Sequence, residues 1–112
     1  LGLGANDMLR GIEPIETKEN LEKIINIIID KNIKIILAGM IAPESYGKEY
    51  GDKFNVIYSN LSDKYSLTFL PFLLEGVAMK PELNLEDGMH PNPKGIKIIS
   101  KNIEKKITGL IY

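Results

Sequence analysis

The sequence predicts an α/β protein in which helices cover a parallel sheet. Three short apolar segments have the length and composition of strands buried on both faces: residues 1–4, 33–40 and 67–74. Each precedes a segment with apolar residues at helical spacing: residues 17–31, 54–61 and 92–107. This alternation favours a parallel sheet, and the functional residues of such sheets gather at the carboxyl ends of the strands.

The first strand and helix follow from the opening of the chain. Leu1–Gly4 is expected to be the end of a buried strand, and the polar Asn6 and Asp7 mark a turn at its carboxyl edge. Residues 8–16 form a connecting loop. Thr17 suits an N-cap, so the helix is expected to begin there. Its core face is expected to comprise Leu21, Ile24, Ile25 and Ile28.

The rest of the chain repeats the pattern. Residues 41–52 contain Pro, Ser and two Gly and are expected to form a loop after the second strand. Pro71 suggests that the third strand lies at the sheet edge or ends early, and a long loop follows to residue 91. Asn92 is expected to cap the last helix, with Pro93 at its first position. The core residues of these two helices are expected to be Phe54, Ile57, Tyr58 and Leu61, then Ile96, Ile99, Ile103 and Ile107.

Composition limits the classes of function. The 112 residues suffice for one domain, and the 14 basic and 15 acidic residues are scattered, so no surface attracts nucleic acid or anionic lipid. The absence of cysteine excludes disulfides, a thiolate nucleophile and cysteine metal ligands. The longest apolar stretches are shorter than the roughly 18 residues of a membrane helix, so stable membrane insertion is not expected. A small-molecule partner is left open.

The single histidine, His90, lies three residues after Asp87 in a run that contains Gly88. A carboxylate this close can accept a hydrogen bond from one ring nitrogen and leave the other free to act as a base. This arrangement corresponds to the base and the orienting acid of a serine hydrolase triad. The alternative is a surface histidine in a turn, because short motifs of this kind often occur by chance.

The segment Gly4-Ala5-Asn6-Asp7 supplies a possible electrophilic group. An asparagine held at a strand end can direct its amide at a developing oxyanion, while Gly4 leaves room for a substrate to approach. The alternative is a turn in which Asn6 or Asp7 caps neighbouring backbone N–H groups.

These two segments resemble a known family. Gly4-Ala5-Asn6-Asp7 is similar to the third sequence block (GxND) of the SGNH, or GDSL-type, hydrolases, and residues 87–91 (DGMHP) are similar to their fifth block (DxxHP). The likeness is greater still to the thioesterase I, lysophospholipase and arylesterase branch. It is carried by GANDMLRG at 4–11, APESYGKEYGDKF at 42–54, LPFLLEGVAMKP at 70–81 and DGMHPNPKG at 87–95.

The resemblance implies a role for each matching residue. His90 would be the general base, Asp87 its orienting carboxylate and Asn6 an oxyanion donor. The substrate would be a small acyl ester or thioester, with no cofactor and no metal. Loops 8–14, 41–50 and 75–85 would border the acyl groove, with Gly4 beside it and these wall residues: Met8, Leu9, Tyr46 and Met79. For each wall residue, ordinary packing onto the core is an equal alternative.

The resemblance also implies a flavodoxin-like, three-layer α/β/α fold with strand order 2-1-3-4-5, truncated at its N-terminus. The family's serine block (GDSL) and its glycine block precede GxND and have no counterpart here. We therefore expect residues 1–112 to be the C-terminal part of one SGNH hydrolase domain, inactive alone, with an unpaired strand edge at Leu1–Gly4. No serine stands in a GDS setting, and Ser45 alone lies near the expected site.

Two other classes of protein stay open. A non-catalytic binding module of flavodoxin or receiver type would share the alternation, although the sequence has no phosphate-binding loop and no paired acids suited to Mg²⁺. A degenerate hydrolase would have lost its serine segment. A metallohydrolase is the weakest alternative, because one histidine with dispersed carboxylates gives no ligand spacing. Family resemblance favours a periplasmic or secreted parent enzyme, with a cytoplasmic one left open, and the oligomeric state is undetermined.

Overall fold

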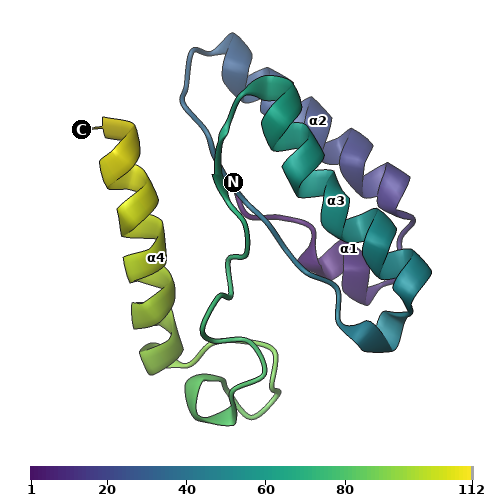
Figure 1. Cartoon of the computed structure of the whole chain (residues 1–112), viewed down its shortest axis with the longest axis vertical. Coiled ribbons are helices and arrows are strands. Elements are labelled where there is room, and N and C mark those ends of the chain that lie inside the picture. Colours follow the sequence, from purple (N-terminus) through teal and green to yellow (C-terminus); the bar gives the residue numbers. More distant parts are fainter. Residues whose placement is uncertain (112) are drawn as a thin grey trace. The chain divides into compact units, whose positions relative to one another are not determined.

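The computed structural model describes residues 1–111 as two compact units, Leu1–Pro71 and the residues from Phe72 onward. Figure 1 shows the elements of both units. The first unit contains helices α1 (Ala5–Leu9), α2 (Pro14–Asp30) and α3 (Lys48–Tyr65), strands β1 (Ile36–Ala38) and β2 (Thr68–Leu70), and the 3₁₀ turn η1 (Glu44–Tyr46). The second unit contains the 3₁₀ turn η2 (Pro81–Leu83) and helix α4 (Pro93–Ile111).

The sheet of the first unit is parallel, as predicted. β1 pairs with β2 in the register Leu37↔Phe69. On the opposite edge of β1, the Leu1 nitrogen donates to the Ile36 carbonyl (2.8 Å) and the Ala38 N–H donates to the Leu1 carbonyl (2.9 Å). These two bonds have the slanted pattern of a parallel ladder. β1 therefore lies between β2 and the start of the chain.

The strands are shorter than the sequence predicts. Residues 1–4 are not assigned as a strand, and only Leu1 pairs; Leu3 is 51% exposed, so the prediction of burial was wrong there. Ile33 is likewise exposed and lies outside β1. β2 ends immediately before Pro71, which confirms that the third strand ends early. Proline has no N–H to donate to a ladder, which explains the position of this end.

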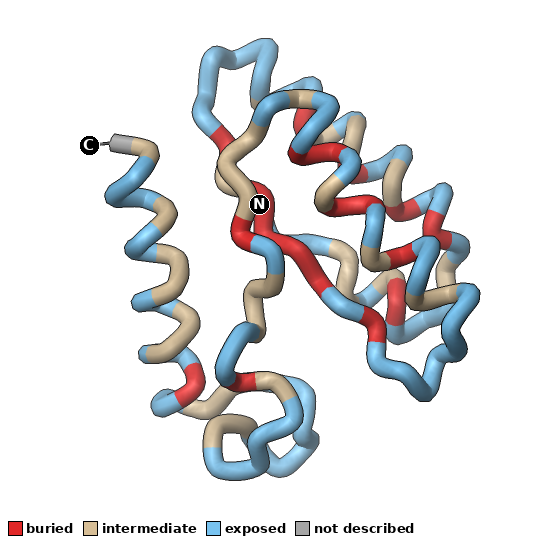
Figure 2. Tube along the Cα trace, viewed as in Figure 1, coloured by how far each residue is buried: buried red, intermediate tan, exposed pale blue. Residues whose placement is uncertain are grey.

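The core of the first unit lies between the strands and helices α2 and α3, which run side by side (Figure 1). Figure 2 shows the buried positions on β1 and along these two helices. The helical spacing correctly identified most of the core: Leu21, Ile25, Phe54, Ile57, Tyr58 and Leu61 are buried. A fully buried side chain of this size contributes about 1.5–3 kcal/mol to folding, so this layer dominates the stability of the unit.

Two expectations about helix starts were wrong. Thr17 is not an N-cap: α2 begins at Pro14, and Thr17 is buried in its first turn, where its hydroxyl donates to the Asp7 carboxylate (2.9 Å). The fixed φ angle of proline and its missing N–H suit the first helical position, which accounts for the earlier start. Asn6 and Asp7 likewise belong to a short helix, α1, rather than to a turn.

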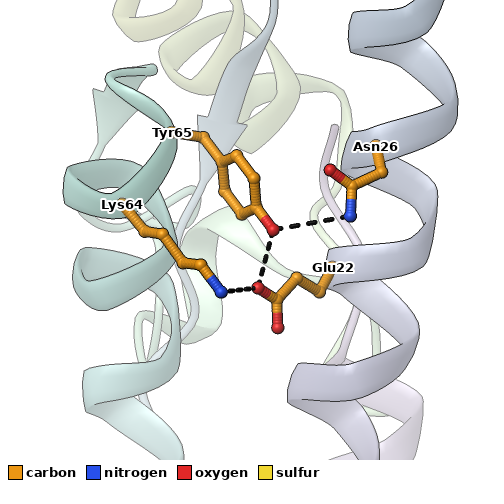
Figure 3. A network of polar contacts seen from close by, with 4 residues as sticks. All are labelled: Glu22, Asn26, Lys64 and Tyr65. Carbon is orange, nitrogen blue, oxygen red and sulfur yellow. Dashed lines mark hydrogen bonds and ion pairs between the residues drawn. The ribbon is translucent and has the colours of Figure 1, made fainter.

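A polar network joins the exposed sides of α2 and α3 (Figure 3). Glu22 of α2 accepts hydrogen bonds from the Lys64 ammonium and from the Tyr65 hydroxyl (2.7 Å). The Asn26 amide donates to the same hydroxyl at 3.4 Å. The hydrogen bond from Lys64 is the main reason that the pKa of Glu22 is lowered. Because the Lys64 side chain is largely exposed, solvent screens this ion pair and the network contributes little stability.

The second unit begins its helix as the sequence predicts. The Asn92 side chain accepts a hydrogen bond from the Gly95 N–H (3.0 Å), and Pro93 is the first residue of α4. None of the four predicted core residues of α4 is buried: Ile96 and Ile107 are exposed, and Ile99 and Ile103 are half-buried. In the first unit, the predicted start of α3 was wrong as well. The helix begins at Lys48, within the predicted 41–52 loop. Among residues 1–111, no helix has the length and apolar character needed to cross a membrane.

Candidate active site

Asp87 and His90 are brought together by the turn that links them. The His90 Nδ1 lies 2.6 Å from Asp87 Oδ2, while Asp87 Oδ1 accepts the backbone N–H groups of Met89 (2.9 Å) and His90 (3.0 Å). Gly88 lies between them at φ +70°, a conformation that glycine adopts without strain. One carboxylate therefore fixes both the backbone of the turn and the imidazole ring. The Nε2 of His90 is left to act on another group.

The same bonds keep Asp87 ionised. The hydrogen bond with His90, reinforced by the two backbone N–H groups, lowers the pKa of Asp87 to about 2. An ionised carboxylate facing Nδ1 selects the tautomer in which Nδ1 carries the proton and Nε2 is a free base. The pair is accessible, since the side chains of His90 and Asp87 are 69% and 40% exposed.

Two asparagines hold the base of this turn. Asn84 pairs with Pro91 in an isolated antiparallel bridge, and the Leu85 N–H donates to the His90 carbonyl (2.7 Å). The Asn84 amide donates to the carbonyls of Val77 (2.9 Å) and Lys80 (2.8 Å). The Asn92 amide donates to the Glu82 carbonyl (2.9 Å). The turn bearing Asp87 and His90 is therefore anchored to the segment before it.

Asn6 lies in the first unit, in the first turn of α1. Asn6 is exposed. It lines a cavity of about 400 Å³ together with residues of the opening segment and of α2. Its neighbour Asp7 is held by Thr17, so the two adjacent polar residues behave differently: Asp7 is tied to α2 and Asn6 faces solvent.

The predicted wall residues have different surroundings. Met8 is buried at 8% exposure, whereas Leu9 and Tyr46 are 44% and 37% exposed, and Tyr46 lines a second cavity beside α3. Met79, in the second unit, is 87% exposed and has a left-handed backbone at φ +65°, which is uncommon for a residue with a side chain.

Gly4 has φ +121°, and a Cβ there would lie 1.9 Å from the Tyr58 hydroxyl oxygen. Its missing side chain therefore makes room for Tyr58. Roles for Gly4 and the wall residues in substrate binding stay predictions.

Three of the chain's five serines have structural contacts or cap positions, and the other two are exposed. The hydroxyls of Ser59 and Ser62 donate to backbone carbonyls within or just after α3. Ser66 ends that helix in a left-handed conformation. Ser45 is exposed in η1, and Ser100 is exposed on α4. Over residues 1–111, the only side-chain partner found for the His90 ring is Asp87.

No group of three or more acidic or histidine side chains suited to a metal ion occurs among residues 1–111.

Comparison with known proteins identifies the family of the chain. A model of the GDSL-like lipase/acylhydrolase family matches residues 1–98. The chain belongs to this family. The GDSL-like match covers α1, both strands and the Asp87–His90 turn, and ends within α4.

Two curated relatives of this GDSL-like chain have assigned activities. It is 37% identical over 105 residues to an arylesterase of Vibrio mimicus, and 33% identical over 109 residues to the thioesterase 1/protease 1/lysophospholipase L1 of Escherichia coli. These alignments cover 94% and 97% of the chain but 52% of each relative. The chain thus spans about half the length of the curated relatives it matches.

Solved structures share the fold. The crystal structure of TesA matches with a TM-score of 0.90 at 28% identity, over 97% of this chain and 61% of that one. The SGNH-hydrolase family esterase AlinE4 matches with a TM-score of 0.74 at 35% identity, over 98% of this chain and 58% of that one. These likenesses confirm the SGNH hydrolase fold that the sequence predicted, present here in part.

Several residues that fix the α1 segment or the Asp87–His90 turn were not predicted to do so from the sequence. Tyr58 was predicted only as a core residue, yet its hydroxyl donates to the Leu3 carbonyl (2.9 Å), 55 residues away. Thr17 was predicted as a cap, and Asn84 was not singled out. The four-residue spacing of Tyr46, Tyr50, Phe54 and Tyr58 was the one signal in the sequence of an aromatic row along α3 and the turn before it.

Proposed function

We propose that this chain is the acid–base half of an ester or thioester hydrolase that acts through an acyl-serine intermediate. The observation that carries the proposal is the 2.6 Å contact between His90 Nδ1 and Asp87 Oδ2, which orients the imidazole with Nε2 free. The named activities of the relatives support this class of reaction: one is an arylesterase and one a thioesterase and lysophospholipase.

Each proposed residue has a defined chemical task. His90 Nε2 takes the proton of a serine hydroxyl as that oxygen attacks the acyl carbonyl, and later gives the proton to the leaving alcohol or thiol. Asp87 stabilises the imidazolium that forms in between. Asn6 donates its side-chain N–H to the oxyanion of the tetrahedral intermediate. Water then attacks the acyl-serine with His90 again acting as the base.

We further propose that the nucleophilic serine lies outside these 112 residues, N-terminal to them. The chain's own serines support this, because Ser59 and Ser62 donate to backbone carbonyls and neither Ser45 nor Ser100 stands in a GDS setting. Loss of the nucleophile from a serine triad lowers turnover by on the order of 10⁶ in a well-studied protease. The 112 residues alone should therefore be inactive.

The proposal is tested in a longer protein that contains this chain and a GDS segment. Asp87→Asn should lower kcat by roughly 10⁴ and His90→Ala by on the order of 10⁶ in hydrolysis of a short-chain p-nitrophenyl ester. The control is Glu86→Gln, which removes the neighbouring exposed carboxylate and should leave kcat unchanged. Near-normal kcat in folded His90→Ala would rule out the proposed role of His90.

A further inference from the structure

α3 and the turn before it carry a row of four aromatic side chains at four-residue spacing: Tyr46, Tyr50, Phe54 and Tyr58. Successive ring centroids are 6.1, 6.0 and 5.6 Å apart, within the range of favourable aromatic pairs. Phe54 and Tyr58 are fully buried and fix the row to the core. The hydroxyls of this row are therefore carried on a rigid support.

Two of these hydroxyls bind the backbone on either side of α1. Tyr58 donates to the Leu3 carbonyl (2.9 Å), just before the helix, and Tyr50 donates to the Ile12 carbonyl (2.9 Å), just after it. Burial raises the pKa of both phenols, so both keep the proton that they donate. The short segment that bears Asn6 is thus attached to α3 at both ends.

A third bond holds the middle of this segment. The buried Thr17 hydroxyl of α2 donates to Asp7 Oδ2 (2.9 Å), next to Asn6 in the chain. The Gly4 backbone also fits around Tyr58, because a Cβ at Gly4 would lie 1.9 Å from its hydroxyl oxygen. Together these contacts leave α1 few ways to shift relative to α2 and α3.

We propose that Tyr58 is a positioning residue for the oxyanion donor Asn6, acting through the Leu3 carbonyl, with the Thr17–Asp7 bond as a second anchor. A helix of five residues is too short to hold its own orientation, so the direction of the Asn6 amide depends on these long-range bonds. Oxyanion donors act only when they are held close to the reacting geometry before the reaction. The inference rests on the proposed function, since it assumes that Asn6 is the donor.

The test is a double-mutant cycle in the longer protein that contains this chain and a GDS segment, called the full-length enzyme below. The values of kcat and KM are measured on a p-nitrophenyl ester. Asn6→Ala should lower kcat by roughly 10²–10³. Tyr58→Phe, which keeps the ring and removes the hydroxyl, should lower kcat about 10-fold with KM little changed, as expected for an interaction felt in the transition state. In the Asn6→Ala background, Tyr58→Phe should change kcat less than about 2-fold, since the group it positions is gone.

Tyr65→Phe is the matched control. Tyr65 also lies on α3 and its hydroxyl also makes a hydrogen bond, but to Glu22 of α2 and not to the α1 segment. Its loss should leave kcat unchanged. If Tyr58→Phe does not fold, Thr17→Val tests the second anchor instead, because valine keeps the shape of threonine but lacks the hydroxyl that binds Asp7. Thr17→Val should lower kcat, whereas Thr17→Ser, which keeps a hydroxyl, should have nearly normal kcat.

The outcomes separate the two proposals. An equal loss from Tyr58→Phe in both backgrounds, or no loss in either, overturns the positioning role and leaves the hydrolase intact. Unchanged kcat in Asn6→Ala overturns the oxyanion assignment and the positioning role together, while dependence on His90 still tests the reaction class. No ester hydrolysis by the folded full-length protein overturns both.

Discussion

The carboxylate of Asp87 uses its two oxygens for different contacts. Oδ1 accepts the N–H groups of the turn, and Oδ2 faces the His90 ring. Both sets of bonds favour the charged form, so one residue both orders the turn and orients the imidazole ring of His90. The spacing of Asp87 and His90 was sufficient to predict this contact, because it forms within three residues. The Tyr58–Leu3 bond spans 55 residues and depends on how α3 packs, which no local pattern reveals.

Asp87 should titrate well below an ordinary aspartate. In the folded protein its carboxyl carbon, followed by NMR, should show a midpoint of about 2 rather than 3.8. Because the folded pKa is lowered, the stability that Asp87 contributes to the turn is present above the unfolded pKa and is lost as the pH falls towards 2. In His90→Ala the midpoint should rise, because the largest cause of the shift is removed. A wild-type midpoint near 3.8 would contradict the contact.

The elements were predicted with uneven success. Helical periodicity located α2, α3 and α4 because each has apolar residues on a repeated face. The starts of the helices were harder to predict. Lys48 begins α3 without a side-chain cap, and residues 41–52, which contain a Pro, a Ser and two Gly, resembled a loop. Each strand has only three residues and is shorter than predicted. The apolar runs that predicted the strands continue beyond the paired residues, into exposed positions such as Ile33.

Gly95 should be required for α4 to approach the base of the Asp87–His90 turn. A Cβ at this position would lie 2.3 Å from the Leu83 carbonyl oxygen, a backbone atom with little freedom to move. Gly95→Ala should therefore lower the free energy of unfolding by about 1–3 kcal/mol, measured by urea denaturation.

The matched control for that substitution lies on the same helix. A Cβ at Gly109 would meet no atom of another element within 4 Å, as far as residues 1–111 are concerned. Gly109→Ala should therefore leave the free energy of unfolding unchanged or raise it, by at most about 1 kcal/mol. Equal effects from the two substitutions would contradict the close approach at Gly95.

For the molecule as a whole, the family assignment and the partial fold agree. The order Leu1–β1–β2 follows from bonds on both edges of β1, and the chain spans 52% of two curated relatives. The sequence predicted the parallel sheet, the Asp87–His90 pair and the family from motifs. It could not predict the contacts that hold α1, because these join residues from three separate elements.

Under the proposed function, residues 1–112 supply the base, its orienting acid and the oxyanion donor, while the nucleophile comes from elsewhere. The most direct test compares hydrolysis of p-nitrophenyl acetate by the 112-residue chain and by a longer protein that contains it with a GDS segment. We predict turnover only in the longer protein, with the chain alone slower by on the order of 10⁶. Comparable turnover by the chain alone, lost in His90→Ala, would mean that one of its own serines is the nucleophile and would contradict the account.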